Sequence, residues 1–227
     1  MNIPLTVRDN ISAAPHRSLF LAGALQGVLT LLWWVFDLTG RYAIAGSATA
    51  WSIAPTWAHA FLMTYGFFPF FIFGFLFTTY PNWMNGDKVK PCEYMATSVL
   101  MVLGVVLFYV GLLTHKAIII AGVELMLVGW GVAVYVLFRI LLTTPAQDKR
   151  HARVISAALL MGWLGVAAYL FWLVTDSSTV LDFARHAGIW FFLLPIVLTV
   201  SHRMIPFFSS RVLDNYEMVR PFWMLWL

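Results

Sequence analysis

The sequence is poor in cysteine and in charge, and each shortage excludes a class of protein. Cys92 is the single cysteine, so the chain has no internal disulfide, no C-x-x-C-H attachment for a c-type haem and no cysteine set for an iron–sulfur cluster. Only 11% of the 227 residues are charged and 61% are hydrophobic, against about 25% and about 45–50% in soluble domains. This balance excludes a soluble enzyme, a disordered chain and a nucleic-acid-binding module.

Long apolar runs are what the sequence has instead. A helix needs about 20 apolar residues to cross a bilayer, and six runs reach that length. They are Ser18–Asp37, Trp57–Tyr80, Tyr94–Leu113, Ile118–Leu142, Val154–Val174 and Phe183–Met204. The sequence therefore predicts an all-α fold, a polytopic transmembrane helix bundle of six spans whose first partner is the lipid bilayer.

The chain ends on a further apolar stretch, Pro221–Leu227. As a helix it would measure only about 10 Å, too short to cross. We interpret it as the start of an incomplete seventh span, so that a missing C-terminal half or a second polypeptide would complete the bundle; a short interfacial anchor is the alternative. The predicted organisation is a cytoplasmic tail (1–17), a six-span membrane domain (18–206) and a cytoplasmic segment with the truncated span (207–227).

Basic residues are distributed unevenly between the two sides of these spans. Eleven of the 14 Lys and Arg fall on the side of the N-terminus: Arg8, Arg17, Lys88, Lys90, Arg139, Lys149, Arg150, Arg153, Arg203, Arg211 and Arg220. Three fall on the other side: Arg41, Lys116 and Arg185. Because cytoplasmic loops carry the excess of Lys and Arg, we expect a cytoplasmic N-terminus.

Ionisable side chains inside a membrane are functional candidates, and three histidines qualify. His59 begins the second span and His186 the sixth, at a similar expected depth, so the two could hold a haem from opposite faces; for His186 a position among the lipid headgroups, beside Arg185, is the alternative. His202 lies sixteen residues after His186, about 24 Å along a helix, and would need a site of its own. The other histidines, which are His16, His115 and His151, are interpreted as solvated.

Further residues extend these hypotheses. Met63 follows His59 by four residues on one helix face, and imidazole with thioether could hold copper. Pro69 and Pro195 should kink the second and sixth spans and open room beside them. Glu124 is a proton-relay acid, a partner for an arginine or protonated filler, and the sequence does not choose among the three.

Two stretches carry a family resemblance. One is His59-Ala60-Phe61-Leu62-Met63-Thr64-Tyr65-Gly66-Phe67 with Gly74-Phe75-Leu76-Phe77-Thr78-Thr79-Tyr80-Pro81-Asn82-Trp83. The other is His202-Arg203-Met204-Ile205-Pro206-Phe207-Phe208-Ser209. Together they resemble the NnrS family of polytopic membrane proteins.

The resemblance implies a protein of the bacterial inner membrane that contains haem (haem b) and copper. It also implies a role in denitrification, nitric oxide metabolism and relief of nitrosative stress, with nitric oxide as a ligand. Members of the NnrS family span the membrane about a dozen times, which would make this chain about half of such a protein. Arg203 matches the second family run, and we count it with the cofactor-binding candidates. Where the family often has a second histidine and a glutamate, this chain has Phe61 and Leu62.

Three functions follow. The first is a haem-binding, or haem- and copper-binding, protein of nitric oxide metabolism, with His59 as axial ligand and His186 or His202 as partner; catalysis and binding both stay open. The second is a cofactor-free half of a transporter or a membrane scaffold. The third is a b-type cytochrome that passes electrons to or from quinone through a bis-histidine haem.

Overall fold

The computed structural model describes residues 13–42, 49–213, 215–217, 219, 221 and 223. In this part of the chain every regular element is helical and six helical segments are long and apolar enough to cross a membrane, which confirms the predicted bundle. The elements are α2 (Pro15–Tyr42), α3 (Pro55–Phe61), η1 (Leu62–Phe67), α4 (Phe68–Met84), α5 (Pro91–Leu113), α6 (Lys116–Thr143), α7 (Arg150–Thr175), α8 (Ser178–His186), η2 (Ala187–Leu193) and α9 (Leu194–Val212). The expected seventh span lies almost wholly outside the described residues.

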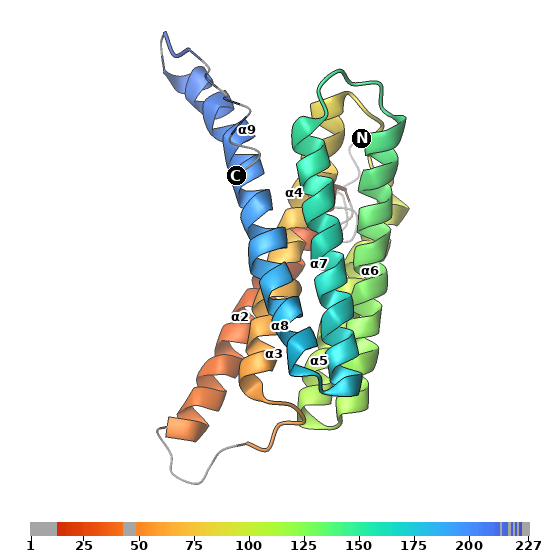
Figure 1. Ribbon diagram of the computed structural model, residues 1–227, viewed down its shortest axis with the longest axis vertical. Helices are drawn as coiled ribbons and strands as arrows, with labels where there is room; N and C mark the ends of the chain where they lie inside the picture. Colours follow the sequence, from red (N-terminus) through yellow and green to blue (C-terminus); the bar gives the residue numbers. More distant parts are fainter. Residues whose placement is uncertain are drawn as a thin grey trace, which may run out of the picture.

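The six spans lie side by side in one bundle (Figure 1), and the second span is the most buried of them. Helix α2 packs on α4 and α5, α5 on α6, α6 on α7, and α7 on the line formed by α8, η2 and α9. We call the side on which α2, α5 and α7 begin the N-terminal side, and the other the opposite side. Asn85 and Asp176 end α4 and α7 in the left-handed region, with φ of 53° and 55°, as C-terminal caps often do.

Helices α5 and α6 form the tightest pair of the bundle. A Cβ on Gly104 would lie 2.6 Å from the carbonyl oxygen of Gly122, so both positions need glycine for the backbones to approach this closely. On the N-terminal side the guanidinium of Arg139 donates to both carboxylate oxygens of Glu93, at 2.5 and 3.1 Å. The hairpin is therefore fixed by close backbone packing along its length and by a bidentate ion pair at one end.

The second and sixth spans are each interrupted by a π-helix. Segment η1 separates α3 from α4, and η2 separates α8 from α9. Proline has no N–H and its ring clashes with the carbonyl four residues earlier, which for Pro69 is Tyr65 in η1 and for Pro195 is Phe191 in η2. The wider π turn relieves this clash, so the kinks expected at the two prolines take the form of π-helices just before them.

The side chain of Tyr65 joins the two interrupted spans. Its hydroxyl donates to the backbone carbonyl of Ala184 in the last turn of α8, three residues before η2 begins. A Cβ on Gly165 of α7 would overlap this hydroxyl, and one on Gly188 of η2 would lie 2.8 Å from it. Tyr65 thus fills a slot that exists only because α7 has glycine at position 165 and η2 has glycine at position 188.

We expect Gly165→Ala to destabilise the bundle because the added methyl group has to displace the Tyr65 ring. Overpacking of this kind costs on the order of 1–3 kcal/mol. Gly131→Ala is the matched control, because the nearest atom to its Cβ would be Nε1 of Trp163, at an ordinary 3.4 Å. Thermal unfolding in detergent should show a lower Tm for the first variant alone, and equal values would contradict the slot.

Candidate functional site

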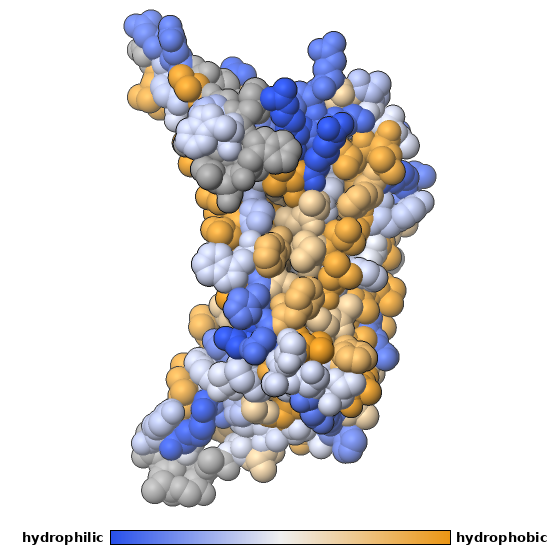
Figure 2. Space-filling view, in the orientation of Figure 1, coloured by the Kyte–Doolittle hydropathy of each residue, from blue (hydrophilic) through white to orange (hydrophobic). Residues whose placement is uncertain are grey.

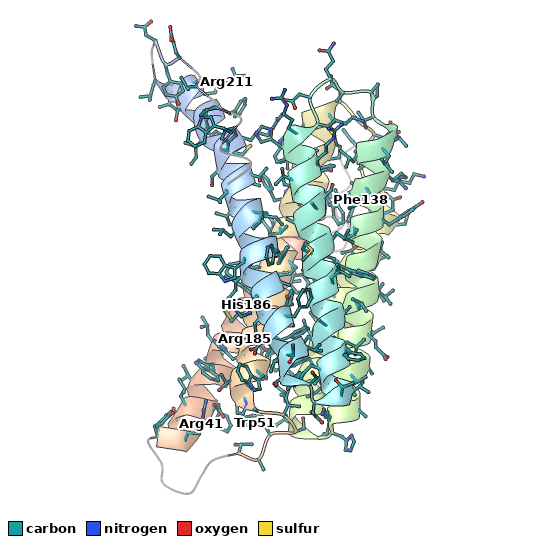
Figure 3. All side chains as sticks on the ribbon, in the orientation of Figure 1. Arg41, Trp51, Phe138, Arg185, His186 and Arg211 are labelled. Atoms are coloured by element: carbon teal, nitrogen blue, oxygen red, sulfur yellow. The ribbon has the colours of Figure 1, made fainter. Side chains whose placement is uncertain are left out.

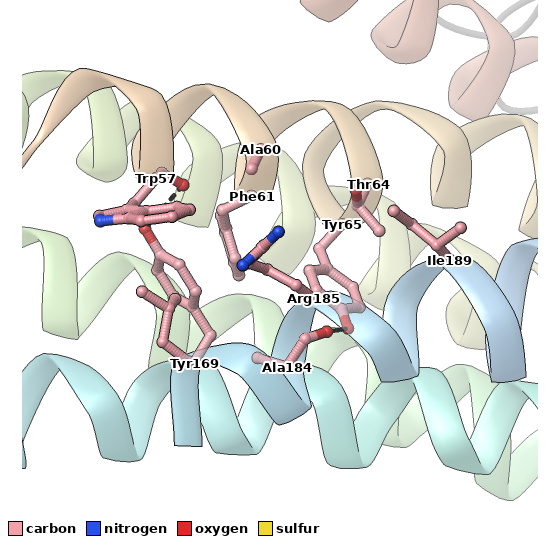
Figure 4. A pocket seen from close by; sticks show the side chains of 10 residues that line it. Trp57, Ala60, Phe61, Thr64, Tyr65, Tyr169, Ala184, Arg185 and Ile189 are labelled. Carbon is pink, nitrogen blue, oxygen red and sulfur yellow. Dashed lines mark hydrogen bonds between the residues drawn. The ribbon is translucent and has the colours of Figure 1, made fainter. Parts of the chain in front are cut away.

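The two π-helices meet in the interior beside a small cavity of about 60 Å³ (Figure 4). Its lining comes from α3 and η1 on one side and from α7, α8 and η2 on the other. π-helical turns occur frequently at functional sites. The volume exceeds what one water needs and lies far below the roughly 300 Å³ of a cofactor pocket, so the cavity suits a few waters or a diatomic molecule.

Arg185 of α8 closes this cavity. Its guanidinium lies 5.1 Å from the ring of Trp57, donates to Asp182 at 2.8 Å and is half exposed. The hydroxyl of Tyr169 donates to the Trp57 carbonyl at 3.2 Å. An arginine in the apolar part of a bundle is thus satisfied by one carboxylate and one aromatic face.

His186 lies next to this cavity at the end of α8, on the outer surface of the bundle (Figure 3). Its Nδ1 lies 2.7 Å from the Asp182 carbonyl oxygen, so Nδ1 carries the proton and donates. Nε2 has no hydrogen-bond partner in the part of the chain that the structure describes. This tautomer is typical of metal-ligating histidines, whose second nitrogen is oriented by a backbone carbonyl.

Exposed apolar side chains flank His186 next to the exposed ion pair of Arg185 with Asp182. Phe183 and Trp190, three residues before and four after it, are 45% and 56% exposed. Figure 2 shows the hollow in the outline of the molecule, with a hydrophilic patch amid hydrophobic side chains, and Figure 3 labels Arg185 and His186 there. The hollow arises because α9 diverges from the bundle (Figure 1) and buries only Ile196 and Thr199.

His59 occupies a different environment, in an aromatic cluster on the opposite side. Its ring stacks on Trp34 at 4.2 Å with 13° between the planes, and its buried Nδ1 has no partner among the described residues. The guanidinium of Arg41 lies over the same Trp34 ring and pairs with the buried carboxylate of Asp37. Trp51 donates to this carboxylate at 2.7 Å.

The expected haem and copper pairs share His59. Among the described residues no hydrogen bond or ring contact joins His59 to His186. In those same parts of the chain no three His, Cys, Asp or Glu side chains lie close enough to hold a metal ion. The role of His59 and Met63 as ligands stays a prediction.

His202 is paired with His151, for which the prediction from the sequence was wrong. His151 was interpreted as solvated, but it is only 4% exposed, and its Nε2 lies 3.0 Å from Nδ1 of His202. The other nitrogen of His202 lies 3.2 Å from the Pro221 carbonyl. A pattern in the sequence could have shown this burial, because His151, Ile155 and Leu159 follow one another at intervals of four residues on the buried face of α7.

The remaining candidates are placed at the surface. Arg203 lies 4.8 Å from the ring of Trp83, next to a cavity of about 260 Å³ on the N-terminal side. Glu124 is exposed on α6 and makes no hydrogen bond or ion pair with a described residue. Of the three interpretations of Glu124, a partner for an arginine is not realised in the described chain.

The family model described as NnrS protein matches residues 10–227. The chain belongs to the NnrS family. The match includes all six spans and every histidine discussed above, and it confirms the resemblance carried by the two sequence runs. No curated protein and no solved structure matches the chain, so the NnrS assignment rests on the family model.

We expect His202→Ala to destabilise the contact between α7 and α9, because it removes the hydrogen bond between the two imidazoles. Removing one partner of a buried hydrogen bond costs about 1–3 kcal/mol. Val197→Ala, at a 58% exposed position on the same helix, should cost little. Thermal unfolding of the two variants in the same detergent measures the difference, and an unchanged Tm for His202→Ala would show that the pair contributes nothing.

Proposed function

We propose that this NnrS family protein is a multi-pass membrane haem protein that binds nitric oxide, and that it serves nitric oxide metabolism or resistance to nitrosative stress. We place it in the bacterial inner membrane with a cytoplasmic N-terminus, as the distribution of basic residues favours. The observation that carries the proposal is His186, an exposed imidazole with a free Nε2 that is flanked by the exposed side chains of Phe183 and Trp190.

The residues around His186 fit one face of a haem b. The Asp182 carbonyl holds Nδ1–H and so directs Nε2 outwards. Phe183 and Trp190 flank the imidazole with exposed apolar surface. Arg185, the residue directly before His186, places a positive charge beside it. A haem iron held by one histidine has an open position at which nitric oxide binds.

The interior cavity complements this surface. Arg185 and Ile189 line it and are the sequence neighbours of His186 on α8 and η2. Trp57, Phe61 and Ile189 give it a mostly apolar wall beside the Arg185 guanidinium, and its size suits a diatomic gas. We infer that the cavity holds nitric oxide close to the histidine before or after binding.

Copper is not part of this proposal, which rests on His186 alone. A bis-histidine cytochrome is also less well supported than a haem with a single histidine. Both nitrogens of His202 are engaged, which leaves fewer candidates for a second axial ligand. The favoured arrangement is therefore one proximal histidine with the opposite position open.

Absorption spectra of histidine variants test this assignment. We expect protein purified from cells supplied with a haem precursor to show a Soret band that shifts on addition of nitric oxide. His186→Gly should lose most of the band and regain it with added imidazole, which replaces the missing side chain. His59→Ala and His202→Ala should keep it. A colourless wild-type protein would overturn the proposal in favour of the cofactor-free scaffold, and a band lost only in His59→Ala would move the ligand to that residue.

A further inference from the structure

A further cavity lies in a lateral groove between α2 and α5, far along the chain from His186. Its volume is about 390 Å³, within the roughly 300–1,000 Å³ of small-molecule sites. Leu25 and Val106 stand on its rim and are 64% and 50% exposed, while Phe70 of α4 is fully buried at its floor. None of the residues that line it belongs to α8, η2 or α9, so this α2–α5 groove is independent of the proposed haem face.

Two polar side chains interrupt the apolar lining of the α2–α5 groove at its inner wall. Gln26 is 4% exposed, and its Nε2 donates to the Thr30 hydroxyl at 2.8 Å, which in turn lies 2.7 Å from the Tyr109 hydroxyl. The amide oxygen Oε1 is buried and has no partner in the described chain. Ser98 of α5 is 6% exposed, and its hydroxyl makes no hydrogen bond with a described residue.

The lining of the α2–α5 groove thus includes one residue with an unpartnered acceptor and one with a free hydroxyl. Thr30 and Tyr109 hold the amide of Gln26 from one side, so Oε1 is the atom left to bind something else. A buried carbonyl of this kind is costly unless a ligand donates to it. The hydroxyl of Ser98 can both donate and accept, so the pair matches a ligand that carries oxygen atoms of both kinds.

The position of the α2–α5 groove restricts how such a ligand arrives. The groove follows α2 from Ser18 to Leu29, about 16 Å of helix, in the half of the span nearer the N-terminal side. It opens between helices rather than at a loop, so a ligand enters from the hydrocarbon of the bilayer. No charged side chain of the described residues lines it, which disfavours a phosphate headgroup and favours a neutral ring with a long apolar tail.

We propose that the α2–α5 groove binds the ring of an isoprenoid quinone or quinol. A quinol hydroxyl donates to Oε1 of Gln26, and a quinone carbonyl accepts from the Ser98 hydroxyl. Leu25, Val106 and Phe70 enclose the ring, and the isoprenoid tail leaves between α2 and α5 into the lipid. Thr30 and Tyr109 are positioning residues, since they orient the amide without touching the ring.

Photolabelling with a decyl-azidobenzoquinone on the purified protein in phosphatidylcholine nanodiscs tests the site. We expect the label to map by mass spectrometry to peptides of α2 and α5 and to be displaced by decylubiquinone. Leu25→Trp fills the rim of the groove and should reduce labelling at least tenfold. Leu32→Trp is the matched control, because Leu32 is 63% exposed on the same helix, lies outside the groove and should label as the wild type does.

Gln26→Leu separates a ring site from a site for any apolar chain. Loss of one hydrogen bond to the ring should weaken decylubiquinone competition about tenfold. If Leu25→Trp abolishes labelling but Gln26→Leu leaves competition unchanged, the groove holds an acyl chain and the proposal is wrong. Labelling outside α2 and α5, or equal labelling of Leu25→Trp and Leu32→Trp, would also overturn it, whether or not the preparation contains haem.

Discussion

Tyr65 packs against Gly165 of α7 and Gly188 of η2, and this contact decides how the rest of the bundle is arranged. A span broken by a π turn leaves backbone carbonyls without their usual partners, and the membrane offers no water to satisfy them. Tyr65 supplies a hydroxyl to the Ala184 carbonyl at the edge of the second break. One break is thereby stabilised by a side chain that emerges from the other, so the two interrupted spans have to lie side by side.

The two interrupted spans are built alike, and this likeness organises the candidate site. Each runs from a short α-helix through a π-helix to a longer helix with proline in its first turn. His59-Ala60 precedes η1 and His186-Ala187 leads into η2. The surroundings differ, because Trp34 of α2 covers His59 whereas no described ring covers His186. The same local motif has therefore produced one enclosed and one accessible imidazole.

Most of the fold could be predicted from the sequence, because hydrophobic runs long enough to cross a bilayer dictate helices and their number. Pro69 and Pro195 identified the sites of the breaks, but a π turn depends on which tertiary contacts satisfy the freed carbonyls. The same limit applies to the histidines. Burial of His151 depends on its meeting His202 across two helices, and the charged residues before it suggested solvent. The α2–α5 groove has no signature in sequence, since it is defined by the crossing of two helices.

Helix α2 shows why chemistry concentrates on the least enclosed spans. Most of its leucine, valine and phenylalanine side chains face outwards. Its buried stripe mixes polar residues, among them Gln26, Thr30 and Asp37, with glycines and with Leu19 and Trp33. A helix selected only for packing would bury small or apolar side chains, since each buried polar group requires a partner. Thr30 and Asp37 have such partners, but Oε1 of Gln26 has none in the described chain. A ligand that reaches a membrane protein through the lipid has to pass between loosely packed helices, and α2 and the α8–α9 span are the two least buried of the six. The unmet acceptor on one and the free imidazole on the other are thus placed where ligands from the bilayer can reach them.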